Sequence, residues 1–339
     1  MKILVPYDGS RYSLSTLQLV ASMALVPGSE ITILYVAHAG AFATAMQNGM
    51  DPVKEQEALI SYSKQLDELS RELALWQKEC VVNFRIRFGP IAETILKTVE
   101  EDGYDLLVMG SHGKKRLSSL VFGSVSRTVL INATRPVLIV KPTEAVRRGE
   151  MGAHGYKVLV PIDNSQHSVH TIDWLTCQAW KEGTRIKLLH VVPEFKDLRK
   201  PNGVSEQLEL LHQKWLLVRE RLHEALENHA LKLGEVVGMS NIEIEVCPGE
   251  PKDEILRAEQ EWLPDIIAMG SRSKPGLNRI LSKSVSAFVG RNCECAELIV
   301  YHNHMYSLPK PRVEKADNTS YDDPVIVQIR ETSPHTVTM

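Results

Sequence analysis

Three glycines and a serine stand at a spacing that suits a phosphate-binding loop. Gly110 and Gly113 follow an apolar run, and Gly123-Ser124 stand after nine further residues, at the start of a helical pattern. Glycine lets backbone N–H groups approach a ligand closely and tolerates positive φ angles. A helix N-terminus adds unpaired N–H donors and a partial positive charge. The pattern predicts an anion site, most simply for phosphate, to which the hydroxyls of Ser124 and Ser126 can add hydrogen bonds; the alternative is that the glycines only make tight turns.

An aspartate near the N-terminus could contribute to the same site. Asp8 follows the apolar run Ile3–Pro6, and the carboxyl ends of parallel strands face one crevice. An acceptor there could bind ribose hydroxyls or the edge of an adenine. The alternative is that Asp8, together with Ser10, only caps the helix that follows. Basic side chains nearby in the sequence could offset phosphate charge: Lys114, Lys115, Arg116 and Arg127.

The elements that must position these residues alternate between two patterns. Short β-branched runs near 3–6, 31–36, 82–87, 105–109 and 137–140 are expected strands, and helical patterns lie between them. Several of the runs are almost continuously apolar, which is typical of strands covered on both faces. The alternation predicts a doubly wound parallel sheet that binds ligands at the carboxyl ends of its strands.

The chain also contains an internal duplication. Residues 3–10 (ILVPYDGS) resemble residues 158–165 (VLVPIDNS). Residues 108–140 align without a gap to 268–300, and 13 of these 33 positions are identical. A register kept across polar loops indicates two homologous units rather than chance apolar similarity.

This duplication predicts the domain organisation. We expect homologous domains at 1–142 and 156–302, joined by a polar linker at 143–155. The tail, 303–339, is expected to be polar and largely disordered, although 325–329 (VIVQI) could form a strand that docks on the body.

The second half departs from the glycine pattern. Gly270 and Ser284 are kept, but Ser273 replaces the second glycine and Lys283 the third. A side chain at either position would crowd the approach to phosphate, and a required positive φ would cost about 1 kcal/mol. The Lys283 ammonium could reach a phosphate, but it cannot reproduce the glycine backbone. An adenosine-like pocket can persist, because three counterparts are kept: Pro161, Asp163 and Val191.

These motifs make the chain resemble the universal stress protein family in its tandem two-domain form. The family's nucleotide motif, G-x2-G-x9-G-[ST], is matched in full in the first half, and the resemblance extends over both halves. It implies an α/β fold, Rossmann-like or adenine nucleotide α-hydrolase-like, with two tandem doubly wound parallel five-stranded sheets of strand order 3-2-1-4-5. The last strand of each domain is implied to mediate domain pairing, and whole chains could pair further as a homodimer.

The resemblance also implies a ligand and its contacts. It indicates binding of ATP or AMP, which Mg²⁺ could accompany, in the first half, with weak or no binding in the second. By motif position, the adenosine contacts would be Pro6, Asp8 and Val36. The ribose and phosphate contacts would be Gly110, His112, Gly113, Gly123, Ser124 and Val125.

Other chemistry has weaker support in the sequence. Cys293-x-Cys295 could form a metal cluster with His302 and His304, but this spacing is not that of common zinc sites, so structural thiols are expected. His167-x-x-His170 is expected to lie on a solvated helix face, since no third ligand can be assigned. His112 lacks a partner base or nucleophile, so no residue is assigned a catalytic or metal-binding role.

Composition limits the partners. The chain has 339 residues, a net charge of −3 and no apolar run long enough for a membrane span, so neither nucleic acid nor a membrane is expected as a partner. Five scattered cysteines favour a reducing cytoplasm. Three functions stay open: a stress-response regulatory module that binds nucleotide and protein partners, a slow Mg²⁺-dependent ATPase or phosphotransfer enzyme, and a scaffold without nucleotide.

Overall fold

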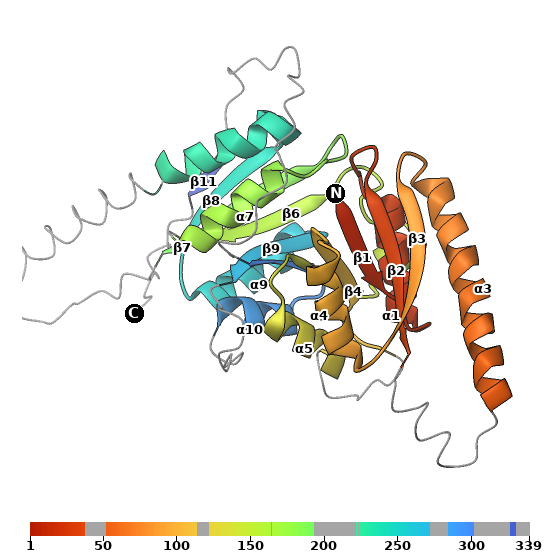
Figure 1. Ribbon diagram of the computed structural model, residues 1–339. Helices are drawn as coiled ribbons and strands as arrows, with labels where there is room; N and C mark the ends of the chain where they lie inside the picture. The colour runs from red at the N-terminus through yellow and green to blue at the C-terminus, as the bar shows by residue number, and fades with distance from the viewer. Residues whose placement is uncertain are drawn as a thin grey trace, which may run out of the picture.

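The strands of both halves join in one sheet (Figure 1). The computed structural model describes residues 1–37, 52–113, 122–163, 165–192, 222, 224–271, 284–301 and 326–329. The first half contributes β1 (Lys2–Pro6), β2 (Glu30–Ala37), β3 (Val81–Phe88), β4 (Leu106–Gly110) and β5 (Val137–Val140). The second contributes β6 (Lys157–Ile162), β7 (Arg185–Val192), β8 (Ile242–Pro248), β9 (Ile266–Ser271) and β10 (Ala296–Tyr301), and the tail adds β11 (Ile326–Ile329).

The strand order confirms the doubly wound topology in both halves. It runs β11-β8-β7-β6-β9-β10-β5-β4-β1-β2-β3, so each half has the expected order 3-2-1-4-5. The two sheets are not separate, however. Their last strands, β5 and β10, pair antiparallel with Leu138 opposite Leu298, which makes one eleven-stranded sheet. This pairing removes the free edge that each half would otherwise expose.

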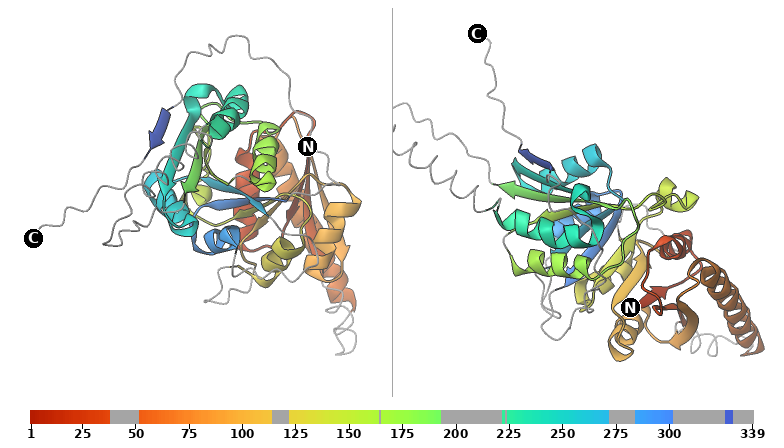
Figure 2. Two further views of the ribbon diagram at one scale, coloured as in Figure 1. Left: turned by 90° about the vertical axis from the view of Figure 1, so that its left-hand side faces the viewer. Right: turned by 90° about the horizontal axis from the view of Figure 1, so that it is seen from above.

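Helices cover both faces of the sheet (Figure 2). One face packs against α1, α3, α7 and the helical residues 224–237, and the other against α4, α5, α9 and α10. Their bounds are α1 (Arg11–Ser22), α3 (Pro52–Trp76), α4 (Ile91–Glu101), α5 (Ser124–Asn132), α7 (Gln166–Thr176), α9 (Pro251–Trp262) and α10 (Val285–Asn292). Two shorter helices are α6 (Glu144–Arg148) and the 3₁₀ turn η1 (Met239–Asn241).

Alternation along the strands explains why their sequences are apolar throughout. In β1, Ile3 and Val5 belong to the core under α1, while Leu4 between them belongs to the core under α4, and all three are fully buried. Successive side chains of a strand point to opposite faces, so a strand covered on both sides needs apolar residues at every position. The carboxyl ends of these strands are the place left for polar, ligand-facing residues.

The expected polar linker is in fact part of the core. Thr143 caps α6 by accepting a hydrogen bond from Val146 N, and Gly149 ends the helix with φ +69°. Val146 and Met151 are 2% and 4% exposed and lie in the core cluster that contains residues of both halves. These two apolar residues anchor the connection in the core, while residues 148–150 and 153–154 stay exposed.

The tail strand expected at 325–329 is present as β11. It pairs parallel to β8, with Ile326 opposite Glu243 and Ile329 opposite Val246, and lies at the end of the sheet (Figure 2). The remainder of 302–339 lies outside the described residues. Among the described helices, none combines the length and the apolar character that crossing a bilayer requires.

The first helix ends earlier than its apolar pattern suggests. Ser10 caps α1 and the helix stops at Ser22, whereas the apolar pattern that follows Ser10 predicts a helix capped by Ser10 or Ser13 that runs to about Leu25. The buried amide of Gln77 explains the end, because its Nε2 lies 2.8 Å from Val20 O, 3.2 Å from Ala21 O and 2.9 Å from Met23 O. Carbonyls at a helix end lack intrahelical partners, and here one side chain supplies them.

Replacing Gln77 with leucine is therefore expected to lower the free energy of unfolding by about 1–3 kcal/mol, because buried carbonyls would lose their donor. Urea denaturation of both proteins measures the change. Gln178→Leu is the matched control, since Gln178 lies just after the end of α7 and its Nε2 donates to one carbonyl near that end, Trp174 O. An equal loss in the two variants would contradict the role assigned to Gln77.

Candidate functional site

The motif residues of the first half converge at the carboxyl ends of β1 and β4. The two strands are neighbours, with Ile3 opposite Leu106, so Asp8 after β1 and the loop after β4 face the same crevice. Gly110 is the last residue of β4, and Gly123 is the N-cap of α5. The crevice thus collects a carboxylate, a glycine loop and a helix N-terminus.

Asp8 is held by the start of α1. Its Oδ1 accepts hydrogen bonds from Ser10 N (3.0 Å) and from the Ser13 hydroxyl (2.9 Å). Ser10 in turn caps the helix by accepting from Ser13 N. The capping role considered for Asp8 and Ser10 is therefore present, and it uses Oδ1 of the carboxylate. It also orients the carboxylate, which any ligand contact in the crevice would require.

The second glycine lies against that carboxylate. A Cβ built on Gly113 would lie 2.7 Å from Asp8 Oδ2, inside van der Waals contact. A Cβ on Gly123 would lie 3.3 Å from His112 Cα and 3.7 Å from Gly113 N. Asp8, Gly113 and Gly123 thus follow one another across the crevice, with a Cβ excluded at Gly113 unless Asp8 moves and tightly accommodated at Gly123.

The prediction that the motif glycines adopt positive φ angles is wrong. None of Gly110, Gly113 and Gly123 has a positive φ, and Gly123 has φ −66°. Close approach of neighbouring atoms, not left-handed backbone, is what these positions require. The expected strain at Ser273 and Lys283 loses its basis for the same reason, and both residues lie outside the described part of the chain.

The N-terminus of α5 is the element expected to bind an anion. No side chain of the described residues caps it, so its first-turn N–H groups face the crevice beside the glycine loop. Ser124 is exposed at this end. Ser126 was expected to donate a hydrogen bond to the ligand. It is instead only 2% exposed, and its hydroxyl donates to Ser111 O at 2.7 Å. It fixes the loop to the helix, together with the bond from Gly123 N to Ser111 O (2.8 Å).

The first glycine has a packing role that the motif did not reveal. A Cβ on Gly110 would lie 2.8 Å from Tyr12 Cβ and 3.0 Å from the Tyr12 carbonyl carbon, because α1 crosses the end of β4 there. In the second half, a Cβ on Gly270 would likewise lie 2.6 Å from His167 O. This shared contact explains why the first glycine alone is kept in both halves.

Gly110→Ala is expected to destabilise the protein by about 1–3 kcal/mol, because the added methyl group overpacks against backbone that must move. Thermal and urea unfolding test this. Gly123→Ala serves as the control, since its Cβ would meet a nearest neighbour at 3.3 Å and needs a shift of only a few tenths of an ångström. Equal stability of Gly110→Ala and the unmodified protein would remove the packing explanation.

The adenosine side of the expected site lies along β1 and β2. Pro6 ends β1 opposite Leu34, and Val36 is half-buried against the core under α4. On the other face, Tyr35 stacks on Tyr62 with ring centroids 4.5 Å apart. Burial and the hydrogen bond with Tyr62 raise the pKa of Tyr35 to about 12, so this phenol stays neutral.

The His112 side chain contacts neighbours in the loop after β4 and in α1. Its Nδ1 is 3.2 Å from Ser111 Oγ, and its ring centroid is 5.1 Å from that of Tyr12. In α5, Val125 is partly buried against the core, and Arg127 is exposed. The other basic residues expected to offset phosphate charge, 114–116, lie outside the described residues.

The second half repeats the aspartate network. Asp163 Oδ1 accepts from Ser165 N (3.1 Å) and from the Ser168 hydroxyl (2.7 Å), as Asp8 does from Ser10 and Ser13. The role of Ser13 could have been found from the sequence, because a serine stands five positions after the aspartate in both halves. The conserved network within one chain marks this turn as a unit that both domains need.

A cavity of about 360 Å³ occupies the corresponding crevice of the second half. Its size lies in the range of small-molecule sites. The counterparts expected to keep an adenosine-like pocket line it, together with apolar neighbours: Pro161, Asp163, Val191, Leu189 and Met269. The persistence of a pocket here agrees with the sequence expectation.

The phosphate end of that cavity differs from the first half. Ser284 caps α10, and its hydroxyl accepts a hydrogen bond from Ala287 N at 3.1 Å. One of the amides that a phosphate would use is therefore already satisfied by the protein. The aligned Ser124 lies one position further along, inside α5, and leaves Gly123 at the cap.

Comparisons with known proteins agree with this geometry. The profile of the universal stress protein family matches residues 1–141 and 156–301. Universal stress protein MJ0577 of Methanocaldococcus jannaschii is 28% identical over 152 residues, 41% of this chain and 94% of that protein.

A solved structure shows the same fold over most of the chain. A universal stress protein from Archaeoglobus fulgidus superposes with a TM-score of 0.60 at 21% identity, covering 89% of this chain and 97% of that one. A family member from Arabidopsis thaliana, solved with AMP bound, is 22% identical over 44% of this chain and 93% of its own, with a TM-score of 0.30. Because the family profile covers both halves, this chain belongs to the universal stress protein family.

Proposed function

We propose that the first half binds ATP or AMP in the crevice between Asp8 and the N-terminus of α5. The observation that carries the proposal is the row Asp8, Gly113, Gly123, which ends on a helix N-terminus that no described side chain caps. Backbone amides and the helix dipole at that end suit phosphate. The oriented carboxylate at the other end suits hydroxyl or amine donors of a nucleoside.

The second half is proposed to bind nucleotide weakly or not at all. Its cavity retains the nucleoside side, but Ser284 satisfies an amide at the phosphate end. Lys283 stands where the first half has Gly123. The two halves would then differ in phosphate recognition rather than in the presence of a pocket.

The proposed role is that of a regulatory module in the stress response. Nucleotide would contact both the loop after β4 and the first turn of α5, so its occupancy can change the surface that partners meet. Binding only to the folded state also stabilises it, by about 2.7 kcal/mol at a hundredfold excess over the dissociation constant.

Mass spectrometry of the small molecule that copurifies with the full chain, followed by calorimetric titration with ATP and AMP, tests the proposal. One bound adenine nucleotide per chain and a raised melting temperature are expected. If neither nucleotide copurifies and neither changes the melting temperature, the protein would instead be a scaffold. Mg²⁺-dependent turnover that Asp8→Ala abolishes while binding persists would identify an ATPase.

A further inference from the structure

Two cysteines and a glutamate meet at the other end of the second half, away from the nucleotide crevice. Glu259 comes from α9, Cys293 follows α10, and Cys295 precedes β10. One carboxylate oxygen and the two sulfur atoms all lie within 4.8 Å of one another. The three residues are only 5–8% exposed, so their grouping is not a chance gathering of surface charges.

The carboxylate is already oriented toward the cysteines. Glu259 Oε1 accepts hydrogen bonds from Glu294 N (2.6 Å) and Cys295 N (3.0 Å), which ties α9 to the turn between the sulfurs. The two amides thus fix the direction of the Glu259 carboxylate beside the sulfur atoms.

The first half supplies a cation to the same group. Lys141, immediately after β5, donates from Nζ to Gly290 O (2.9 Å), to Cys293 O and to Cys293 Sγ (3.0 Å). An ammonium beside a thiol favours its thiolate form. Hydrogen-bond donors of this kind are also the outer partners that orient and balance metal-bound ligands.

The group is reachable from a cavity. A cavity of about 430 Å³ lies beside the connection between the halves, and Glu259 and Cys295 form part of its wall, with Met151 and Leu256 nearby. An ion can therefore enter without unfolding, and water can complete a coordination sphere. The cavity is separate from the nucleotide crevice, which Asp163 and Ser284 line.

The duplication shows that the first half has no such group. The positions aligned with Glu259, Cys293 and Cys295 at the offset of the second alignment are Val99, Ala133 and Arg135. Val99 and Ala133 are buried apolar residues. A carboxylate and two thiols thus replace core and turn residues in one half only, at a place where the shared fold needs none of them.

We propose that Glu259, Cys293 and Cys295 bind a zinc ion, with a water from the cavity as the fourth ligand. Zn²⁺ prefers thiolate and carboxylate ligands in tetrahedral geometry, with Zn–S distances near 2.3 Å, which the observed spacing allows with small side-chain shifts. Soft thiolates disfavour Mg²⁺ and Ca²⁺. The sequence analysis considered His302 and His304 as further ligands and favoured structural thiols; both histidines lie outside the described residues, and the residue that the fold brings to the two cysteines is Glu259.

Metal content and spectroscopy of the full chain test the proposal. After exposure to Zn²⁺ and dialysis, about one zinc ion per chain is expected, and Co²⁺ in its place should give the charge-transfer absorption of cobalt–thiolate bonds. Both signals should be lost in Cys293→Ser and in Cys295→Ser. Cys177→Ser is the matched control, because Cys177 is another buried thiol, whose Sγ donates to Asp173 O at 3.2 Å, outside the Glu259 group.

Glu259→Gln separates ligation from folding, since the amide oxygen can still accept the two backbone hydrogen bonds. Its zinc affinity is expected to fall more than about tenfold while its far-ultraviolet circular dichroism is unchanged. Failure of the unmodified protein to retain zinc, or equal retention by Cys293→Ser, would overturn the proposal. So would unchanged affinity in Glu259→Gln.

Discussion

Gly123→Lys is expected to weaken ATP binding by the full-length protein at least about tenfold, a loss of about 1.4 kcal/mol in binding free energy. The Cβ alone would approach His112 Cα to 3.3 Å and Gly113 N to 3.7 Å, and the rest of the side chain would fill the space in front of α5. The variant copies the second half, where Lys283 holds the aligned position. Isothermal titration calorimetry with ATP and with AMP measures the effect.

Two variants control this experiment. Gly123→Ala adds only the Cβ, so its loss of affinity should be smaller than that of the lysine variant. Lys283→Gly changes the second half and should leave the first binding event unaltered. ATP affinity that is unchanged in Gly123→Lys would place the nucleotide elsewhere and would contradict the proposed function without bearing on the zinc group.

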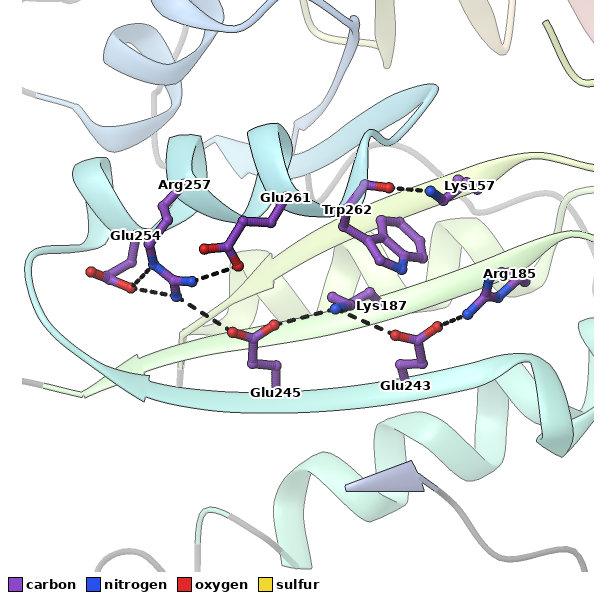
Figure 3. A network of polar contacts seen from close by, with 9 residues as sticks. All are labelled: Lys157, Arg185, Lys187, Glu243, Glu245, Glu254, Arg257, Glu261 and Trp262. Atoms are coloured by element: carbon purple, nitrogen blue, oxygen red, sulfur yellow. Dashed lines mark hydrogen bonds and ion pairs between the residues drawn. The ribbon is translucent and has the colours of Figure 1, made fainter. Parts of the chain in front are cut away.

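Lys187→Met is expected to lower the free energy of unfolding by about 3–5 kcal/mol, because it removes the cation from a buried network of charges. Lys187 Nζ lies 3.3 Å from Glu243 Oε2 and 3.3 Å from Glu245 Oε2, on strands that α9 covers (Figure 3). Glu245 is 2% exposed, so it cannot recover its lost partner from water. Arg257 remains 3.4 Å from Glu245 and only partly compensates.

Urea denaturation at two ionic strengths measures this loss. Lys232→Met is the control, since Lys232 pairs with Asp173 at 2.8 Å on the surface and is 52% exposed, which makes a loss below about 1 kcal/mol the expectation. A double variant, Lys187→Met with Glu245→Leu, should regain stability relative to Lys187→Met, because the most deeply buried carboxylate is then gone and the remaining one, Glu243, keeps its ion pair with Arg185. Equal stability of the two lysine variants would show that the network contributes little.

At the equivalent positions of the first half, the paired strands carry uncharged side chains. Thr32 and Asn83 occupy the places of Lys187 and Glu243 on paired strands, and Thr32 Oγ1 donates to Asn83 Oδ1 at 2.7 Å. Neither pair can be recognised from the sequence, because its two strands are far apart along the chain. Only strand register brings them together.

The sequence shows the residues of the proposed nucleotide site more readily than those of the proposed zinc group, for a physical reason. Gly113 and Gly123 belong to one strand-loop-helix unit, so short-range geometry brings them together and their spacing in the sequence carries the information. Glu259 lies more than thirty residues before Cys293 and Cys295. Its approach depends on how α9 packs beside α10 and β10, which spacing alone does not encode.

Periodicity, turn residues and the duplicated segments by themselves determined the fold class and the location of the glycine loop, because these depend on local patterns, and the family resemblance implied the strand order and the pairing of the two last strands. Tertiary structure alone decided that β5 and β10 pair antiparallel with Leu138 opposite Leu298, that Gly110 packs against Tyr12, and that Ser284 occupies an amide at the second crevice. The first two depend on contacts between residues that are distant along the chain. The third depends on the residue at which a helix begins. Contacts of these kinds exist only once the chain is packed.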